Sequence, residues 1–232
     1  MDLKNLPGIY ILIPAYNEAE KIESVISGLK NEGYSNILIV DDGSKDKTRQ
    51  KALKAGAQVL THIINRGQGS ALKTGIAYLR ENMSPDIIVT FDADGQHQAK
   101  DIERLIQPIL EEKIDIVLGS RFLKKKSNAP FLRKTILKAG IFFTNFISKI
   151  QLTDTHNGLR ALGRNAINSI EISHRGMEHA SDIIDEITKN NLSYKEVPVE
   201  IIYSDYSKTK GQKNLGFIKM GIKILIKKIT ER

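Results

Sequence analysis

Three oxygen-bearing side chains, Asp92, Asp94 and Gln96, stand at alternate positions directly after the hydrophobic run DIIVTF at 86–91. Two carboxylates two residues apart are hard oxygen ligands, which Mg²⁺ and Mn²⁺ prefer. Such ions take few protein carboxylates and complete their coordination with water and substrate phosphates. The spacing therefore predicts a divalent-metal site for a phosphorylated substrate, in which Gln96 adds a neutral oxygen. The structural alternative is a turn whose aspartate caps the helix expected from Ala99.

Polar residues also follow the other expected strands. The segment PAYNE at 14–18 comes after the first strand, DDGS at 41–44 after the second, and SR at 120–121 after the fifth. Carboxylates there can accept hydrogen bonds from a base or a ribose, although Asn17 and Ser44 are also good helix N-caps. In open α/β sheets, ligands bind outside the carboxyl ends of the strands. The convergence of four polar segments on one edge of the sheet predicts a binding site there.

Short apolar runs alternate with helical patterns through the first half of the chain. Continuous apolar runs are typical of buried parallel strands, and their alternation with helices indicates βαβ units. We therefore predict an α/β fold with a mostly parallel central sheet flanked by helices. The expected strands are 8–13, 36–40, 57–61, 86–91 and 115–119, and the expected helices are 18–31, 45–55, 69–81 and 99–113.

The second half of the chain is less regular. Helical patterns cover 133–150 and 180–190, and the segment DTHNGLR at 154–160 has the composition of a loop. The run YKEVPVEI at 194–201 predicts a strand. Pro198 indicates the edge of a sheet, because proline cannot donate a hydrogen bond to a central strand ladder.

The composition fits one globular domain that acts on an anionic partner. The 232 residues are 41% hydrophobic and 27% charged, the net charge is +8, and there is no cysteine. A positive balance favours nucleotides, nucleic acids or acidic membrane surfaces, and the absence of thiols excludes disulfides and zinc–thiolate sites. The sequence shows neither a secretory signal nor a run of about 18 apolar residues, so a cytoplasmic location is expected.

The last residues predict a separate element. We divide the chain into a main domain over 1–212 and a C-terminal helix over 213–232, in which Lys219, Lys223 and Lys227 repeat every four residues among apolar side chains. A basic amphipathic helix can lie on an anionic membrane or pack on the domain, and both interpretations stay open. If this helix binds lipid, the protein is peripheral at the inner face of the cell membrane, alone or with a small membrane-protein partner.

Two common nucleotide-binding motifs do not occur in the chain. The segment NRGQGSALKTG at 65–75 has glycines before a helix, which suits phosphate, but it follows the third strand and is not G-x-G-x-x-G. This disfavours a Rossmann dinucleotide site, and there is no P-loop sequence. A phosphatase with an aspartate nucleophile in FDADG would carry that motif after the first strand of its domain, whereas here the motif follows the fourth.

Taken together and in this order, PAYNE, VDDGS, ALKTG, DADGQH and GSR resemble the motifs of the family 2 glycosyltransferases, which have the GT-A fold. Within that family the chain is similar to the dolichol-phosphate-mannose synthase-like branch over about residues 8–210. The segments DTHNGLRA at 154–161 and MEHASDIIDEI at 177–187 extend the similarity. The branch's usual R-x-x-G-x-S-K ending is replaced here by DYSKTKGQ at 205–212, a departure on the acceptor side.

The resemblance implies an inverting, metal-dependent hexosyltransferase. It would move a sugar from a UDP- or GDP-linked donor to a polyprenyl phosphate or a cell-surface glycan. Asp92, Asp94 and Gln96 would hold Mg²⁺ or Mn²⁺ against the donor diphosphate. The residues implied for the nucleotide sugar are Pro14, Ala15, Tyr16, Asn17, Glu18, Val40, Asp41, Asp42, Lys73, Asp92, Ala93, Asp94 and Arg121.

The acceptor decides which further groups are needed. A lipid phosphate is already anionic, whereas a sugar hydroxyl needs a general base. Asp154 and Asp182 are the candidate bases, beside Asp94 and Arg121 as catalytic residues. Arginine suits bidentate phosphate contacts, with a surface ion pair as the alternative for the two arginines on the acceptor side. The residues implied for the acceptor are Arg133, Arg160, Lys208 and Lys210.

Two other functions stay open on the sequence alone. A nucleotidyltransferase on a similar sheet needs a glycine-rich, arginine-containing loop after the first strand, where this chain has PAYNE. A nucleic-acid-binding protein needs basic residues clustered with exposed aromatics, but aromatics are only 6% of the chain and acids crowd the expected site. We therefore expect no nucleic-acid partner. Of the histidines, only His97 has a sequence position that indicates a place near the site, because it follows Asp92, Asp94 and Gln96, the metal motif.

Overall fold

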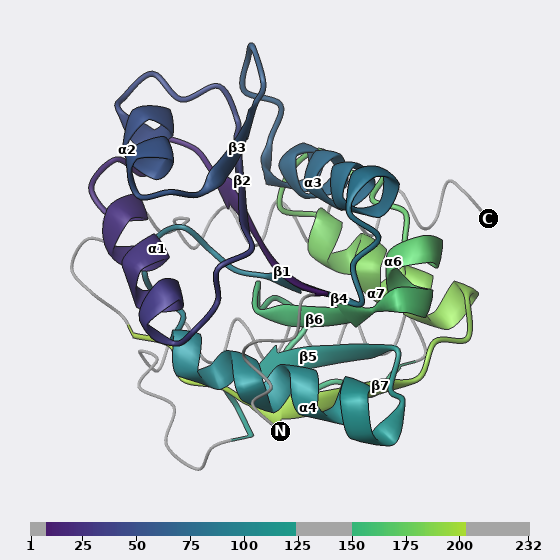
Figure 1. Ribbon diagram of the computed structural model, residues 1–232. Helices are drawn as coiled ribbons and strands as arrows, with labels where there is room; N and C mark the ends of the chain where they lie inside the picture. Colours follow the sequence, from purple (N-terminus) through teal and green to yellow (C-terminus); the bar gives the residue numbers. More distant parts are fainter. Residues whose placement is uncertain (1–7, 124–149, 203–232) are drawn as a thin grey trace.

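The computed structural model describes residues 8–123 and 150–202, which build a sheet with helices on both faces (Figure 1). Within these ranges the sheet has seven strands in the order β3-β2-β1-β4-β6-β5-β7. The strands are β1 (Ile9–Ala15), β2 (Ile37–Asp41), β3 (Gln58–Thr61), β4 (Ile87–Thr90), β5 (Ile116–Ser120), β6 (Arg160–Gly163) and β7 (Tyr194–Pro198).

Most neighbouring strands run parallel, as predicted. Strands β1 to β4 are parallel to their neighbours among themselves, β5 is parallel to β7, and β6 runs antiparallel between β4 and β5. In this register, Ile11 of β1 lies beside Ile37 of β2 and Val89 of β4. The sequence does not predict β6, because its four residues, RALG, follow a segment of loop composition and show no alternation of polar and apolar residues.

Helices cover the two faces of the sheet (Figure 1). The helices on one face are α1 (Ile22–Asn31), α2 (Thr48–Lys54) and α4 (Ile102–Glu112), the last preceded by the 3₁₀ turn η2 (Ala99–Asp101). The helices on the other face are α3 (Gln68–Asn82), α6 (Arg164–Ser169) and α7 (His179–Lys189).

Strand β1 shows how a continuous apolar run builds two cores. Successive side chains of a strand point to opposite faces of the sheet. Ile11 and Ile13 therefore pack with Ile22 and Ile26 of α1, while Leu12 packs on the opposite face with α3. All five side chains are fully buried, which explains why the strand needs no polar face.

Helices α1 and α2 begin later than predicted, at Ile22 and Thr48. The expected N-cap residues make other contacts. The Asn17 backbone N–H donates to Ser44 Oγ at 2.9 Å, and the Asn17 side-chain oxygen accepts from the Lys45 N–H at 2.9 Å. The polar segments after β1 and β2 are thus tied to each other rather than capping the two helices.

Strand β7 forms one edge of the sheet, as Pro198 predicts. Beyond this strand the chain returns to the loop that carries the metal motif. The Ile202 N–H donates to the Gln96 carbonyl at 2.9 Å, and His97 pairs with Ile201 in an isolated antiparallel bridge. The loop after β4 is therefore fixed by a segment more than a hundred positions away in the sequence.

Two predicted helices, over 133–150 and 213–232, fall outside the described residues, with only Ile150 of the first described. The domain boundary expected at residue 212 lies outside them as well. None of the described helices is both long enough and apolar enough to span a bilayer.

Candidate active site

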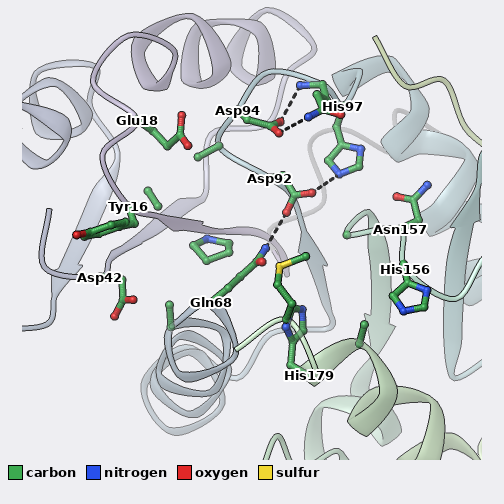
Figure 2. Close-up of a pocket in the computed structure, with 18 of the residues that line it drawn as sticks. Tyr16, Glu18, Asp42, Gln68, Asp92, Asp94, His97, His156, Asn157 and His179 are labelled. Carbon is green, nitrogen blue, oxygen red and sulfur yellow. Dashed lines mark hydrogen bonds and ion pairs between the residues drawn. The ribbon is translucent and has the colours of Figure 1, made fainter. Parts of the chain in front are cut away.

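A cavity of about 400 Å³ opens at the carboxyl ends of β1, β2 and β4, the edge at which α/β sheets bind ligands. Its volume lies in the usual range for small-molecule sites. Figure 2 shows side chains from this edge and from the starts of α3 and α7 around one space. The predicted site residues that line it are Pro14, Ala15, Tyr16, Glu18, Asp42, Asp92, Ala93, Asp94, Gln96, Arg121 and Arg160.

Other predicted site residues do not line this cavity. Lys73 is exposed on α3, and the two candidate bases are buried away from the cavity wall. The described residues in this group are Asn17, Val40, Asp41, Lys73, Asp154 and Asp182. The predicted acceptor residues outside the described ranges are Arg133, Lys208 and Lys210. The structure therefore gathers most of the predicted strand-end residues in the cavity lining but neither of the candidate bases.

Two sides of the cavity can be distinguished (Figure 2). The residues of the β1–β2 side are Pro14, Ala15, Tyr16, Glu18, Asp42, Asn65, Gly67 and Gln68. The residues of the β6–α7 side are Arg121, His156, Asn157, Gly158, Arg160, Met177, His179 and Ala180. In Figure 2, Tyr16 and Asp42 lie to one side of Asp92, with His156 and Asn157 to the other.

Asp42 organises the loop that leads into α3. Its Oδ1 accepts from the Arg66 N–H at 2.9 Å and contacts His62 Nδ1 at 2.7 Å, and its Oδ2 accepts from the Gly67 N–H at 2.7 Å. His62 Nε2 in turn contacts Thr74 Oγ1 at 2.9 Å. Because hydrogen bonds to a buried carboxylate are strong, Asp42 fixes the shape of the β1–β2 side as well as lining it.

The start of α3 lies beneath a second loop, which contains His174 and Arg175. A Cβ at Gly67 would collide with the Arg175 carbonyl, and a Cβ at Gly69 with the His174 carbonyl. The Ser70 N–H donates to the Arg175 carbonyl at 3.2 Å. Glycine is needed at both positions because the backbone of another segment passes directly over them. These glycines serve loop packing, a role that the sequence alone does not separate from phosphate binding.

Asp182 holds this second loop in place. Its Oδ2 accepts from the backbone N–H groups of Ser173 at 2.9 Å and of His174 at 2.7 Å, and its Oδ1 contacts His174 Nδ1. With these contacts and little exposure, Asp182 has the geometry of a positioning residue for the loop rather than of a base that faces substrate.

Asp92 is held from two sides. Its Oδ2 contacts His97 Nε2 at 2.9 Å, and its Oδ1 accepts from Gln68 Nε2 at 3.1 Å (Figure 2). Burial alone would raise the pKa of Asp92, but the hydrogen bond and charge of His97, with His179 and Arg160, outweigh burial and hold the pKa below its ordinary value. Asp92 is therefore an anion at neutral pH.

Asp94 lies two residues further along the same loop. It accepts hydrogen bonds from the backbone and side-chain amides of Gln96. Its pKa is raised, first by burial and then by the neighbouring charge of Asp92. A divalent cation between the two carboxylates would relieve this repulsion, and oxygen ligands are those that Mg²⁺ and Mn²⁺ prefer. The residues present therefore fit the expected metal.

Gln96 orients Asp94 in this structure, because its side-chain nitrogen bonds to the Asp94 carboxylate. Among the described residues no group of three or more histidine, cysteine, aspartate or glutamate side chains is placed to hold a metal ion. The protein thus offers two carboxylates at this point. Water and substrate phosphates would have to complete the coordination, as is usual for Mg²⁺.

Arg121 is fixed at the cavity wall by Asp154. Its Nε and Nη2 donate to the two oxygens of Asp154 at 2.6 and 3.2 Å, and its backbone N–H donates to the same carboxylate at 3.1 Å. The Asp154 side chain is 1% exposed. Because both oxygens are occupied, Asp154 positions the guanidinium and is poorly placed to take a proton from an acceptor.

Arg160 is a buried cation in the cavity wall. The residue is 3% exposed, and no hydrogen bond joins its guanidinium to another described residue. Burial lowers its pKa to about 10, against the opposing charges of Asp92 and Asp154, so the side chain is charged at neutral pH. A guanidinium with its N–H groups available inside a cavity is suited to a planar or anionic acceptor group.

Two neutral histidines stand on the same side as Arg160. Burial is the main reason that the pKa values of His156 and His179 fall to about 4, and the Arg160 charge adds to it. His156 Nδ1 contacts Thr155 Oγ1 at 2.8 Å, and His179 Nδ1 donates to the Gly176 carbonyl at 2.9 Å. Imidazoles with such low pKa values are weak bases at neutral pH.

The sequence does not predict the cavity residues Gln68, His156, Asn157, Gly158, Met177, His179 and Ala180. An Asn-Gly pair is a turn signal, so residues 157–158 are recognisable as a turn. Their place beside Asp92 arises only from β6 pairing with β4. A Cβ at Gly158 would collide with the Asp92 carboxylate, a constraint that no local pattern carries.

Comparison with known proteins agrees with this geometry. The UDP-N-acetylglucosamine--dolichyl-phosphate N-acetylglucosaminyltransferase of Methanococcus voltae is 35% identical over 242 residues, which cover 95% of this chain and 96% of that protein. The undecaprenyl-phosphate mannosyltransferase of Micrococcus luteus is 29% identical, with 87% of this chain and 86% of that protein covered.

A solved structure shares the fold. Glucosyl-3-phosphoglycerate synthase from Mycobacterium tuberculosis, in complex with Mn²⁺, UDP and glucosyl-3-phosphoglycerate, superposes with a TM-score of 0.73 at 20% sequence identity, covering 96% of this chain and 78% of that chain. The expected GT-A fold is thereby confirmed.

The family itself is shown by the sequence. Residues 10–171 match Glycosyl transferase family 2, a range that contains the strand-end motifs, both carboxylates of the metal motif and the two cavity arginines. This match supports a sugar transferase over a nucleotidyltransferase or a nucleic-acid-binding protein. The chain therefore belongs to glycosyl transferase family 2 and is an enzyme of the glycosyltransferase class.

Proposed function

We propose that the protein transfers a sugar from a UDP-linked donor to a polyprenyl phosphate, with Mg²⁺ or Mn²⁺ and with inversion at the anomeric carbon. The relatives from Methanococcus voltae and Micrococcus luteus are named for transfer to dolichyl phosphate and undecaprenyl phosphate. The M. voltae relative is also named for a UDP-linked sugar. The choice of UDP over GDP rests on that relative.

The donor would lie along the cavity from the β1–β2 side to the β6–α7 side. Pro14, Tyr16 and Glu18 would contact the base and ribose, beside the loop that Asp42 shapes. Asp92 and Asp94 lie at the middle of the cavity, where the diphosphate would come next. They would hold the metal, which neutralises charge on the leaving nucleoside diphosphate.

The observation that carries the choice of acceptor is the charge of the β6–α7 side. The described residues lining this side include the cations Arg121 and Arg160 and the weakly basic His156 and His179. No carboxylate lines that side among the described residues. A hydroxyl acceptor would need a base that this wall does not supply, whereas an anionic phosphate needs none and is attracted by the arginines.

The reaction then requires little proton transfer. A phosphate oxygen of the acceptor forms a bond to the anomeric carbon while the bond from that carbon to the donor diphosphate breaks. The bonding electrons leave with UDP. The residues described here orient the two substrates, hold the carboxylates in place and keep a positive field on the acceptor side.

The membrane placement of the enzyme is part of the proposal. A polyprenyl phosphate resides in a membrane, so the enzyme would work at its surface, and the basic residues over 213–232 would favour an anionic leaflet. Arg133, Lys208 and Lys210 would add positive charge near the acceptor.

The test is a transfer assay with UDP-[¹⁴C]N-acetylglucosamine, polyprenyl phosphate in detergent and Mn²⁺, measuring label in the organic phase. We expect product with the phosphate and none with the matching polyprenol. Replacing Arg160 with glutamine should raise the KM for polyprenyl phosphate by about 10- to 100-fold, because hydrogen bonds to charged groups are worth roughly 1.5–3 kcal/mol.

The matched control is Arg164→Gln. Arg164 lies on α6, outside the cavity lining, in an exposed ion pair with Asp86, and such pairs contribute little. Its KM should be unchanged. Equal transfer to polyprenol and polyprenyl phosphate, or an unchanged KM in Arg160→Gln, would count against a phosphate acceptor.

A further inference from the structure

The cavity dictates where the transferred sugar must lie. In the strand order β2-β1-β4-β6, the base-binding segments follow β1 and β2, and the metal-motif carboxylates follow β4. A nucleotide diphosphate laid across this edge therefore directs its sugar toward the β6–α7 side. This placement rests on the proposed function. Figure 2 shows His156 and Asn157 beyond Asp92 on that side, with His179 between His156 and Gln68.

His179 presents a hydrogen-bond acceptor to this space. Its Nδ1 lies 2.9 Å from the Gly176 carbonyl, which can only accept, so Nδ1 carries the proton. Its low pKa of about 4 keeps the ring neutral at pH 7. The remaining nitrogen, Nε2, is then a lone-pair acceptor, and no hydrogen bond joins it to another described residue. The residue lines the cavity.

Two apolar residues of the segment that carries His179 also line the cavity. Met177 and Ala180, from the same segment, line the cavity with it. The segment is fixed rather than adaptable, because Asp182 holds its preceding loop and the backbone of that loop rests on Gly67 and Gly69. A rigid acceptor nitrogen in a wall that also carries two apolar side chains suits a ligand group that combines an N–H donor with a methyl group.

We infer that His179, with Met177 and Ala180, recognises the 2-acetamido group of the donor sugar. The acetamido N–H donates to His179 Nε2, and the methyl group packs against the two apolar side chains. A 2-hydroxyl sugar offers a donor but leaves the apolar wall unfilled. The site thus selects N-acetylhexosamine donors over hexose donors, which makes His179 a specificity-determining residue.

The experiment is isothermal titration of the full chain in Mn²⁺ with UDP, UDP-N-acetylglucosamine and UDP-glucose. We expect the wild type to bind UDP-N-acetylglucosamine at least about tenfold more tightly than UDP-glucose, because the acetamido methyl group fills the apolar wall that a 2-hydroxyl leaves empty, and one such group in an apolar pocket is worth roughly 10- to 200-fold. His179→Leu should reduce this ratio to near one, because without the bond to Nε2 the acetamido group is no longer held against the apolar side chains. His179→Gln, which can offer an oxygen acceptor, should restore part of it.

A control variant and the affinity for UDP distinguish a change in sugar selectivity from a general loss of binding. Arg175→Gln, an exposed side chain in the same segment outside the cavity lining, should keep the wild-type ratio. UDP affinity should stay within about twofold in all variants, which reports an intact nucleotide site.

Equal wild-type affinity for the two sugars, or an unchanged ratio in His179→Leu, overturns the assignment while leaving the proposed function standing. The wild-type comparison does not depend on any variant folding. Failure of UDP itself to bind would overturn the proposed function and this inference together.

Discussion

The two sides of the cavity are encoded in different ways. The β1–β2 side is built from short segments that directly follow parallel strands, such as PAYNE after β1 and DDGS after β2. The β6–α7 side is built from a turn at 156–158 and from the start of α7. The turn is brought to the cavity by the antiparallel pairing of β6 with β4 and β5, and the start of α7 by the loop at 174–175, which packs on the start of α3. Local patterns thus specify the first side, and tertiary packing specifies the second.

The carboxylates of the metal motif stand where the two sides meet. Asp92 is hydrogen-bonded to Gln68 at the start of α3 and to His97. Gly158 of the β6–α7 side lies directly against the Asp92 carboxylate. A disturbance of either side should therefore reach the metal motif.

Asp94→Asn should have the largest effect. Loss of partners in the outer shell of a metal typically lowers affinity or activity 10- to 100-fold, so loss of a direct ligand should lower turnover by at least about a hundredfold. Transfer rates at saturating donor and acceptor measure this. Turnover within tenfold of the wild type would mean that Asp94 does not hold the metal.

Acidification should destabilise the β6–α7 side through His179. Its folded pKa of about 4 lies below the ordinary value of 6.5, so between these pH values the unfolded chain binds a proton that the folded chain does not. The free energy of unfolding should therefore fall as the pH drops from 6.5 to 4. The full contribution is of the order of 3 kcal/mol at about 1.4 kcal/mol per pKa unit.

Urea unfolding of the wild type and of His179→Gln at several pH values measures this contribution. The variant should lose less stability than the wild type across that window, and the two slopes should agree above pH 7. Parallel curves throughout the window would show that His179 is not held neutral.

Gly158→Ala should disturb the metal motif from the β6–α7 side. The added Cβ would collide with the Asp92 carboxylate, and the displaced carboxylate should weaken UDP binding in Mn²⁺ by about 10- to 100-fold. Gly28→Ala in α1 is the matched control, because a Cβ there meets nothing within 4 Å. Titration calorimetry with and without Mn²⁺ compares them, and equal affinity in both variants would contradict the close approach.

Asp182→Asn should have the smallest effect. The amide keeps one oxygen for the backbone N–H groups of Ser173 and His174 but loses the charge that strengthens those bonds. We expect a loss of about 1–2 kcal/mol in the free energy of unfolding and turnover within about tenfold of the wild type. A loss of turnover as large as that of Asp94→Asn would instead indicate a general base.

The sequence predicts the parallel part of the fold well, for physical reasons. Apolar runs buried on both faces and separated by helical patterns identify β1 to β5 and helices α1 to α4, and Pro198 correctly places β7 at the edge. The ends of α1 and α2 are less accurate, because Asn17 and Ser44 bond to each other across two loops instead of capping. Such a contact has no local signature.

The site is predictable where chemistry follows a strand directly. Asp42, Asp92, Asp94 and Arg121 are examples that line the cavity. The candidate base Asp154 shows the limit of this reasoning, because both oxygens of its carboxylate accept hydrogen bonds from Arg121. His179 shows the converse, because its role depends on a tautomer fixed by the Gly176 carbonyl.

We propose that one cavity binds a nucleotide through a metal held by Asp92 and Asp94. The most direct test is the thermal unfolding of the wild type and of Asp94→Asn with UDP, in Mn²⁺ or in EDTA, since a ligand that binds the native state raises the unfolding temperature. We predict that UDP stabilises the wild type strongly only with Mn²⁺ and that Asp94→Asn loses this increment. An equal shift in EDTA, or in the variant with Mn²⁺, would contradict the account.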